Sequence, residues 1–200
     1  WALGTIGKIC GVKLTVIGKE NIPKDQAVLY VCNHRSYFDI LLTYSRCKRR
    51  TGYIAKKEMM SYPLLRTWMK RLYCLFLDRD NPKEGLKTIL KAIEYVKSGI
   101  SICIFPEGTR NTGEELSVLP FHSGSFKIAE KSGCPIVPIS MNNTISIFEK
   151  QFPRIKKTHV IIEYGKPIYA KDLDREQKKQ LSQNCQKIIE DTIKKNQALL

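Results

Sequence analysis

Short apolar runs alternate with helical segments along almost the whole sequence, and this alternation constrains the fold more than any other feature. Most runs are apolar at every position, which is typical of strands covered on both faces. Strands separated by helices usually pair in parallel, so the sequence predicts a single α/β domain with a mixed, largely parallel central sheet flanked by helices. The predicted strands are residues 14–17, 27–32, 53–55, 74–77, 100–105, 136–140 and 159–164.

Residues that typically start and stop helices mark the segments between these strands. Asn81 and Pro82 suit the N-cap and the first helical position, and Gly99 is placed to end the same helix. A second helix is predicted over 124–132, and a third, long and basic, over 174–196. Active residues of such sheets tend to lie at strand ends, so a site is expected there.

The length of 200 residues suits one domain over 1–200, and neither a repeat nor a linker divides it. The charge is unusual, since 34 Lys and Arg against 19 Asp and Glu give a formal net charge of +15. This balance favours a polyanionic partner: nucleic acid, an anionic membrane surface or a phosphorylated substrate. The 7 cysteines are scattered without a C-x-x-C pair, which favours reduced thiols in a cytosolic setting.

The predicted strand at 27–32 runs directly into a polar segment with a histidine and a carboxylate. His34 stands at the carboxyl end of this strand, and Ser36 with Asp39 has the spacing of a capping box that opens the next helix. The Asp39 carboxylate would then accept a hydrogen bond from one ring nitrogen of His34 and leave the other nitrogen free as a base. The spacing alone fits purely structural roles at least as well, with Asp39 as a cap and His34 as a loop residue.

Four ordered segments resemble the signatures of the glycerolipid acyltransferases, the family of lysophosphatidic acid acyltransferase. Asn33-His34, followed by Asp39, resembles the first signature. Further segments resemble a recurrent family segment, the end of the second signature, the third signature and the fourth, in this order: 55–58 (Ala-Lys-Lys-Glu), 76–79 (Phe-Leu-Asp-Arg), 105–110 (Phe-Pro-Glu-Gly-Thr-Arg) and 137–139 (Val-Pro-Ile). They define a core of about 27–140, and the strand and basic helix at about 158–198 lie outside it.

Two positions depart from the family pattern. The second signature usually opens with a glycine several residues before its arginine, and this chain has Tyr73 there. This departure puts the shape of the start of that strand in question, more than the role of the arginine. Ser123 stands where the family often carries a lysine, so no binding role is assigned to it.

The resemblance implies an enzyme that moves a fatty acyl group from acyl-CoA or acyl-carrier protein to the sn-2 hydroxyl of 1-acyl-glycerol 3-phosphate, giving phosphatidic acid. His34 would be the general base, and Asp39 would stabilise the imidazolium. Ser36 is explained as a helix cap, so no covalent acyl-enzyme is expected. Backbone N–H groups at the helix start after His34 are the expected donors to the oxyanion. No cofactor and no metal are expected.

The resemblance also implies which residues bind the substrate. Arg79 and Arg110 are expected on the phosphate, since a guanidinium suits bidentate contact with phosphate, and Lys56 is a further candidate. Glu107 is expected to orient an arginine or a substrate hydroxyl, and Gly108 to let the backbone turn closely. The complete set of expected binding residues is Lys56, Arg79, Glu107, Gly108, Thr109 and Arg110.

A lysophospholipid acceptor implies an anionic membrane surface as a partner. Leu64, Leu65, Trp68, Met69 and Leu72 fall at helical spacing beside basic residues, which fits an interfacial helix or a buried core helix. No run approaches the ~18 apolar residues of a membrane span. The expected location is the cytoplasmic face of a membrane, peripherally or through an N-terminal anchor outside this chain, which starts with Trp1 instead of Met.

Two alternatives stay open at this point. A sister acyltransferase that acts on glycerol 3-phosphate or another lysophospholipid would carry the same signatures. A basic, non-catalytic protein that binds nucleic acid or membranes would explain the charge but not the four ordered segments. The sequence lacks the aromatic and basic interleaving of RNA-binding domains, so no nucleic-acid partner is expected.

Overall fold

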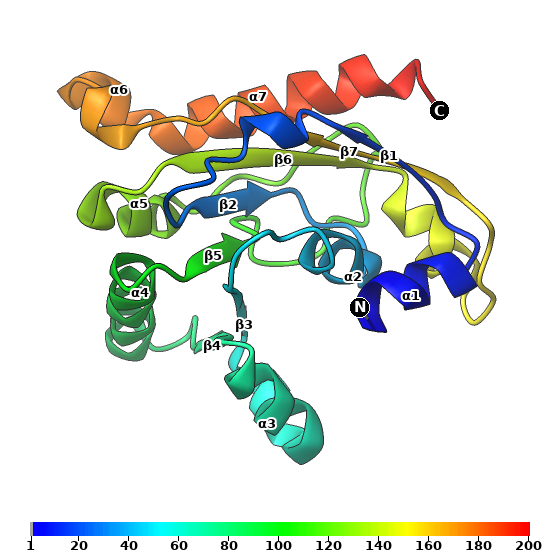
Figure 1. Cartoon of the computed structure of the whole chain (residues 1–200), viewed down its shortest axis with the longest axis horizontal. Coiled ribbons are helices and arrows are strands. Elements are labelled where there is room, and N and C mark those ends of the chain that lie inside the picture. Colours follow the sequence, from blue (N-terminus) through cyan, green and yellow to red (C-terminus); the bar gives the residue numbers. More distant parts are fainter. Residues whose placement is uncertain (1) are drawn as a thin grey trace.

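Within residues 2–200, which this computed structural model describes, seven strands form one sheet in the order β1-β7-β6-β2-β5-β3-β4 (Figure 1). Trp1 lies outside the described residues. The expectation of an N-terminal anchor rested on this residue and stays a prediction. Neighbouring strands pair in parallel except β6 and β7, which are antiparallel. The predicted α/β fold is therefore confirmed. The strands are β1 (Lys13–Ile17), β2 (Leu29–Cys32), β3 (Thr51–Lys56), β4 (Leu75–Leu77), β5 (Ser101–Ile104), β6 (Ile136–Asn142) and β7 (His159–Tyr164).

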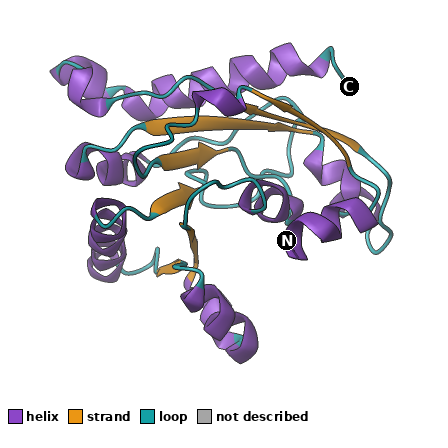
Figure 2. Cartoon of the chain, in the orientation of Figure 1, coloured by secondary structure: helices purple, strands orange, loops and turns teal. Residues whose placement is uncertain are grey.

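Helices lie on both sides of the sheet (Figure 2). The start of α4 follows the prediction, because the Asn81 side chain accepts hydrogen bonds from the backbone N–H groups of Lys83 and Glu84. In the described part of the chain, no helix has the length and apolar character that crossing a bilayer requires. The helices are α1 (Ala2–Ile9), α2 (Phe38–Tyr44), α3 (Pro63–Arg71), α4 (Pro82–Lys97), α5 (Lys127–Ser132), α6 (Arg175–Lys179) and α7 (Leu181–Gln197).

Two predicted helices have different bounds in the structure. The basic segment predicted as one helix over 174–196 forms α6 and α7, because Gln180 leaves the helical conformation (φ −94°, ψ 5°) between them. Leu181, the first residue of α7, is buried in the apolar core, so α7 packs on the core from its first residue onward. The segment predicted as a helix over 124–132 starts as the 3-10 helix Ser123–Phe126, and only α5 is α-helical.

An apolar cluster on each face of the sheet explains why the central strand β2 is apolar at every position. In β2, Leu29 and Val31 belong to the cluster that packs against α4, α5 and α7, whereas Tyr30 and Cys32 belong to the cluster on the α2 side. All four side chains are buried. A central parallel strand of this kind has no solvent face that would require polar residues.

The carboxyl ends of β2, β3, β4 and β5 meet at one edge of the sheet, because these strands are parallel neighbours. His34 follows β2, Lys56 ends β3, Arg79 follows β4 and Glu107 follows β5. The fold thus brings together four segments that are far apart in the sequence. Each of them carries a residue expected at the site.

Tyr73 has a left-handed backbone (φ 59°) at the position where the family usually has glycine. The turn before β4 therefore keeps a conformation that glycine adopts without strain, although a tyrosine occupies it. Gly52 in β3 provides the space, because a Cβ on Gly52 would overlap the carbonyl oxygen of Tyr73. The Tyr73 ring packs edge-on against Tyr95, with ring centroids 5.8 Å apart.

Candidate active site

His34 lies in the loop after β2, where its imidazole is fixed on two sides. Its Nδ1 atom lies 2.8 Å from Oδ2 of Asp39. Its ring stacks on Phe105, with centroids 4.1 Å apart and an interplanar angle of 21°. Nε2 has no hydrogen-bond partner among residues 2–200, and the side chain is 15% exposed. This arrangement leaves Nε2 as the nitrogen that can take a proton from a bound hydroxyl.

Asp39 is fully buried on the first turn of α2. Its Oδ2 atom accepts hydrogen bonds from the backbone N–H groups of Arg35 (2.7 Å) and Ser36 (2.8 Å), in addition to the contact with His34. The carboxylate therefore both caps the loop at the helix start and contacts the imidazole, so the two predicted contacts of Asp39 occur together. These amide contacts hold Asp39 in place independently of His34.

The predicted capping box is only half present. The Asp39 carboxylate accepts the Ser36 N–H as expected, but α2 begins at Phe38, and the Ser36 hydroxyl accepts the N–H of Phe38 (3.0 Å). The same hydroxyl donates its hydrogen to Oε2 of Glu149 at 2.8 Å, and its oxygen keeps lone pairs that accept the Phe38 N–H. The Ser36 hydroxyl thus both donates and accepts a hydrogen bond within the protein, which agrees with a capping residue rather than a nucleophile.

The backbone N–H groups after His34 are already used by the protein, contrary to the prediction that they stabilise an oxyanion. Those of Arg35 and Ser36 donate to Asp39, and that of Tyr37 donates to Oε1 of Glu149 at 2.8 Å. The next N–H, from Phe38, goes to the Ser36 hydroxyl. Three of these N–H groups are unavailable to a substrate because the carboxylates of Asp39 and Glu149 accept their hydrogen bonds.

Glu149 is a site residue that the sequence did not indicate. It lies in the short 3-10 helix Glu149–Gln151, beyond the last recognised segment, and it contacts both Ser36 and the backbone of Tyr37. Its Oε1 atom is also 3.7 Å from Nη1 of Arg110. No local pattern predicts this role of Glu149, because two of its partners, Ser36 and Tyr37, lie more than a hundred positions earlier in the chain.

Glu107 connects the loops after β2 and β5 from a buried position. Its Oε1 atom accepts the backbone N–H of His34 at 2.5 Å, and its Oε2 atom accepts the N–H of Leu119 at 2.8 Å. Burial raises the pKa of Glu107 to about 7, against the opposing effect of these two N–H donors. Of the two roles expected of Glu107, contact with an arginine is absent from the described residues, because its oxygens hold backbone amides instead. Contact with a substrate hydroxyl stays a prediction.

Gly108 and Arg79 link the third and second predicted segments. The Arg79 guanidinium donates through Nη1 to the carbonyl oxygen of Gly108. Gly108 has φ +75°, and a Cβ there would lie 3.2 Å from Nε2 of His122 and 3.4 Å from Nη1 of Arg79. The predicted close backbone turn at Gly108 is therefore present, and it brings Arg79 next to the loop that Glu107 joins to His34.

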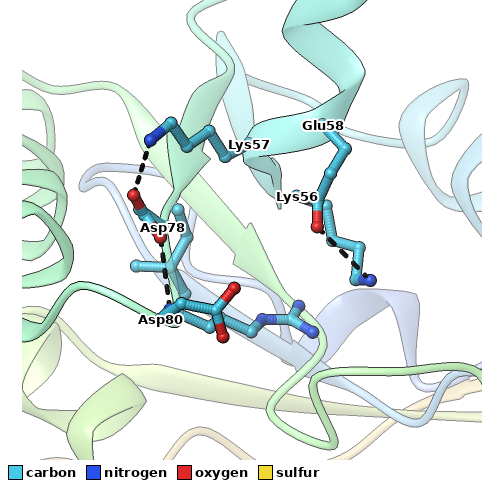
Figure 3. Close-up of a pocket in the computed structure, with 7 residues that line it drawn as sticks. Lys56, Lys57, Glu58, Asp78 and Asp80 are labelled. Carbon is cyan, nitrogen blue, oxygen red and sulfur yellow. Dashed lines mark hydrogen bonds and ion pairs between the residues drawn. The ribbon is translucent and has the colours of Figure 1, made fainter.

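A cavity of about 430 Å³ opens beside Arg79 at the ends of β3 and β4 (Figure 3). Within it Lys57 reaches Asp78 at 2.6 Å, a contact that raises the lysine pKa and lowers the aspartate pKa. Lys56 and Glu58 are both exposed and lie 3.8 Å apart, so their pairing is weak. The lining residues are Lys56, Lys57, Glu58, Leu77, Asp78, Arg79 and Asp80.

Arg110 is held apart from this cavity by contacts with the loop after His34. Its guanidinium stacks 3.9 Å above the centre of the Tyr37 ring, and Nη2 donates to the Tyr37 hydroxyl at 3.1 Å. Its Nη1 atom lies 3.7 Å from Oε1 of Glu149. The two predicted phosphate-binding arginines, Arg79 and Arg110, therefore have different surroundings, and Thr109 between Gly108 and Arg110 is exposed.

Comparisons with known proteins show which family the chain resembles in sequence. The family model described as Acyltransferase matches residues 13–142. Relatives named 1-acyl-sn-glycerol-3-phosphate acyltransferase include one from Saccharomyces cerevisiae, 30% identical over 92% of this chain and 61% of its own length. Another, from Cocos nucifera, is 35% identical over 84% of this chain and 54% of its own length, so the chain spans little more than half of these relatives.

The fold also matches a solved enzyme. The 1-acyl-sn-glycerophosphate (LPA) acyltransferase from Thermotoga maritima superposes with a TM-score of 0.81 at 27% sequence identity, covering 98% of this chain and 79% of that protein. The family model spans the predicted His34, Lys56, Arg79 and Glu107 segments, which the fold gathers at one edge of the sheet. The chain belongs to the acyltransferase family.

Proposed function

We propose that this chain transfers a fatty acyl group from a thioester to the sn-2 hydroxyl of 1-acyl-glycerol 3-phosphate, producing phosphatidic acid. The observation that carries the proposal is the 2.8 Å contact between Nδ1 of His34 and Oδ2 of Asp39, at the same sheet edge as a cavity lined by charged residues that include Arg79 and Lys56. The names of the relatives from Saccharomyces cerevisiae and Cocos nucifera support this acceptor.

In the proposed reaction His34 acts as the general base. Nε2 accepts the proton of the acceptor hydroxyl while its oxygen attacks the thioester carbonyl carbon. The tetrahedral intermediate then collapses, the carbon–sulfur bond breaks, and the imidazolium returns the proton to the leaving thiolate. Such base assistance typically contributes ~10²–10⁴-fold to the rate. The buried Asp39 carboxylate would stabilise the imidazolium between these two proton transfers.

A direct transfer fits the surroundings better than a covalent acyl-enzyme. Ser36 offers a hydroxyl in the loop after His34, but it donates to Glu149 and accepts from the Phe38 N–H. A nucleophilic serine needs a base within hydrogen-bonding reach, and among residues 2–200 Nε2 of His34 makes no hydrogen bond to the Ser36 hydroxyl. His34 is therefore assigned to the substrate hydroxyl.

Arg79 and Lys56 are the proposed ligands of the acceptor phosphate. Both line the cavity, and Lys57 beside them is paired with Asp78. A guanidinium that donates to one carbonyl keeps further N–H groups for phosphate oxygens. Arg110 is a second proposed phosphate ligand, and it would have to leave Tyr37 and Glu149 to reach a ligand in this cavity.

Acyl-CoA and acyl-carrier protein are both proposed as donors, since each presents the same thioester. The proposed location is the cytoplasmic face of a membrane, where a lysophospholipid resides. The formal net charge of +15 supports an anionic surface.

A matrix of acceptors and donors tests the function. Purified protein is incubated with glycerol 3-phosphate, lysophosphatidic acid and other lysophospholipids, each with acyl-CoA and with acyl-carrier protein, and the products are identified by mass. Phosphatidic acid from lysophosphatidic acid is the expected product, and it should disappear in His34→Ala. His159→Ala is the matched control, because His159 bonds Thr15 on the far strands of the sheet. A preference for another acceptor would contradict the assignment.

A further inference from the structure

The helix α3 carries apolar side chains that the domain leaves in solvent. Leu64 is 90% exposed and Trp68 is 45% exposed, and Tyr62, which precedes the helix, is 60% exposed. Leu64 and Trp68 are one helical turn apart and therefore lie on the same face. None of the nine described residues of α3 is buried, so the core-helix interpretation of this segment is wrong.

The position of α3 sets it apart from the other helices. Together with the 3-10 helix Lys57–Ser61 it forms the connection from β3 to β4, and Figure 1 shows it projecting away from the sheet. This connection begins at Lys56 and returns to Asp78 and Arg79, which line the cavity. A surface that held α3 would therefore lie next to the proposed phosphate site.

Charge accompanies the exposed apolar face. The charged residues of α3 are Arg66, Lys70 and Arg71, and the helix has no acidic residue. Lys70 and Arg71 are exposed, near the end of the helix that follows Trp68. An exposed tryptophan and leucine flanked by cations on one short helix is the pattern of a segment lying at the surface of an anionic bilayer.

We infer that α3 is the element by which this domain docks on an anionic phospholipid bilayer, with Leu64 and Trp68 among the lipid headgroups and Lys70 and Arg71 on their phosphates. The inference deepens the proposed function, because it assigns to α3 the delivery of a membrane-resident acceptor to the adjacent cavity. The helix then acts as the contact between the active edge of the sheet and the lipid surface.

A second copy of the chain fits this face less well. A stable protein interface buries roughly 800 Å² on each partner. The exposed apolar part of α3 is confined to Leu64, Trp68 and the preceding Tyr62. A symmetric contact between two such helices would also bring Arg66, Lys70 and Arg71 toward their own copies, and like charges repel. Bilayer phosphates offer the opposite charge.

Vesicle flotation tests the docking without any need for catalysis. The protein is mixed with phosphatidylcholine vesicles that contain or lack phosphatidylglycerol, and the bound fraction is measured. The wild-type chain should float with the anionic vesicles, and Leu64→Ser combined with Trp68→Ser should lower its partition coefficient about tenfold or more. The double variant Ile188→Ser and Leu199→Ser is the matched control, because both side chains are exposed on or beside α7.

The results distinguish the possible partners of the exposed face of α3, a bilayer or a second copy of the chain. Equal flotation of the α3 variant and the wild type would overturn the inference. Loss of a wild-type dimer in the α3 variant, measured by light scattering, would assign the face to a second copy and would also overturn it. Flotation that is selective and depends on α3 supports the inference even if the chain transfers no acyl group, in which case only the proposed function fails.

An activity measurement adds a second readout. Transfer to a short-chain, monomeric lysophosphatidic acid should be the same in the α3 variant and the wild type, since α3 lies outside the residues that contact His34. The apparent KM for the same headgroup presented in anionic vesicles should rise about tenfold, in step with the lost partitioning. An equal loss on both substrates would indicate damage to the site and would contradict a docking role.

Discussion

The backbone N–H of His34 donates to the Oε1 atom of Glu107 at 2.5 Å, which joins the loop after β2 to the loop after β5. Asp39 holds the ring of the same histidine through Nδ1. The backbone and the imidazole of His34 are thus fixed by two different buried carboxylates. One of them, Glu107, carries a pKa that burial raises into the neutral range.

Glu107 should make stability depend on pH. Its pKa of about 7 in the folded protein exceeds the ordinary value of 4.5, so the folded state keeps a proton that the unfolded chain has lost. The free energy of unfolding should therefore fall as pH rises from about 4.5 to about 7, by on the order of 3 kcal/mol, and level off above. Urea midpoints measured across this range check the slope.

The variant Glu107→Gln should flatten this part of the stability profile, because it has no proton to lose there. Glu94→Gln is the control, since that glutamate is exposed on α4 beside Lys91. It should leave the wild-type slope in place. A slope that persists unchanged in Glu107→Gln would show that another group is responsible.

Asp39→Asn should reduce turnover by ~10²–10⁴-fold while the fold is kept. The amide oxygen can still accept the backbone N–H groups of Arg35 and Ser36, but the negative charge that would stabilise a protonated His34 is gone. Asp39→Ala should also lower the melting temperature, because it leaves buried N–H groups without an acceptor. Melting curves and initial rates for both variants separate the two effects, and wild-type turnover in Asp39→Asn would refute the orienting role.

The strands and the gathering of the site were predictable because they follow from short-range features. β2 is apolar at every position and β5 at every position except Ser101, and the two strands run in parallel, so the polar residues that follow them, His34 and Glu107, had to emerge at the same sheet edge. The spacing from His34 to Asp39 likewise permits a contact between the loop after β2 and the first turn of α2. Such features need no knowledge of distant partners.

The partners of those residues were not predictable in the same way. Glu149 reaches Ser36 and Tyr37 from a 3-10 helix after β6, and nothing in its local sequence indicates a contact with a loop more than a hundred positions earlier in the chain. The family resemblance implied that Glu107 orients an arginine or a substrate hydroxyl. In the folded protein the backbone N–H groups of His34 and Leu119 bind the Glu107 carboxylate instead, and only the fold brings them next to it.

Arg79→Ala should raise the KM for lysophosphatidic acid by ~10–100-fold and change kcat less, because a charge-assisted hydrogen bond to phosphate contributes about 1.5–3 kcal/mol. Monoacylglycerol, which has no phosphate, should be used equally poorly by the variant and the wild type. Arg154→Ala is the control, since Arg154 is exposed and does not line the cavity. Steady-state kinetics with both acceptors decide the matter, and an unchanged KM in Arg79→Ala would remove this residue from the phosphate site.

Gly52→Ala should destabilise the protein strongly, because the added Cβ would overlap the carbonyl oxygen of Tyr73, a backbone atom that cannot move without reshaping the turn before β4. A loss of about 2–4 kcal/mol is expected, with a melting temperature lower by ~5–15 °C for a chain of this size. Gly124→Ala is the matched control, since nothing lies within 4 Å of its Cβ position. Because β4 leads directly to Arg79, Gly52→Ala should also weaken acceptor binding well below its melting temperature. Equal melting temperatures for the two variants would mean that the turn at Tyr73 yields easily.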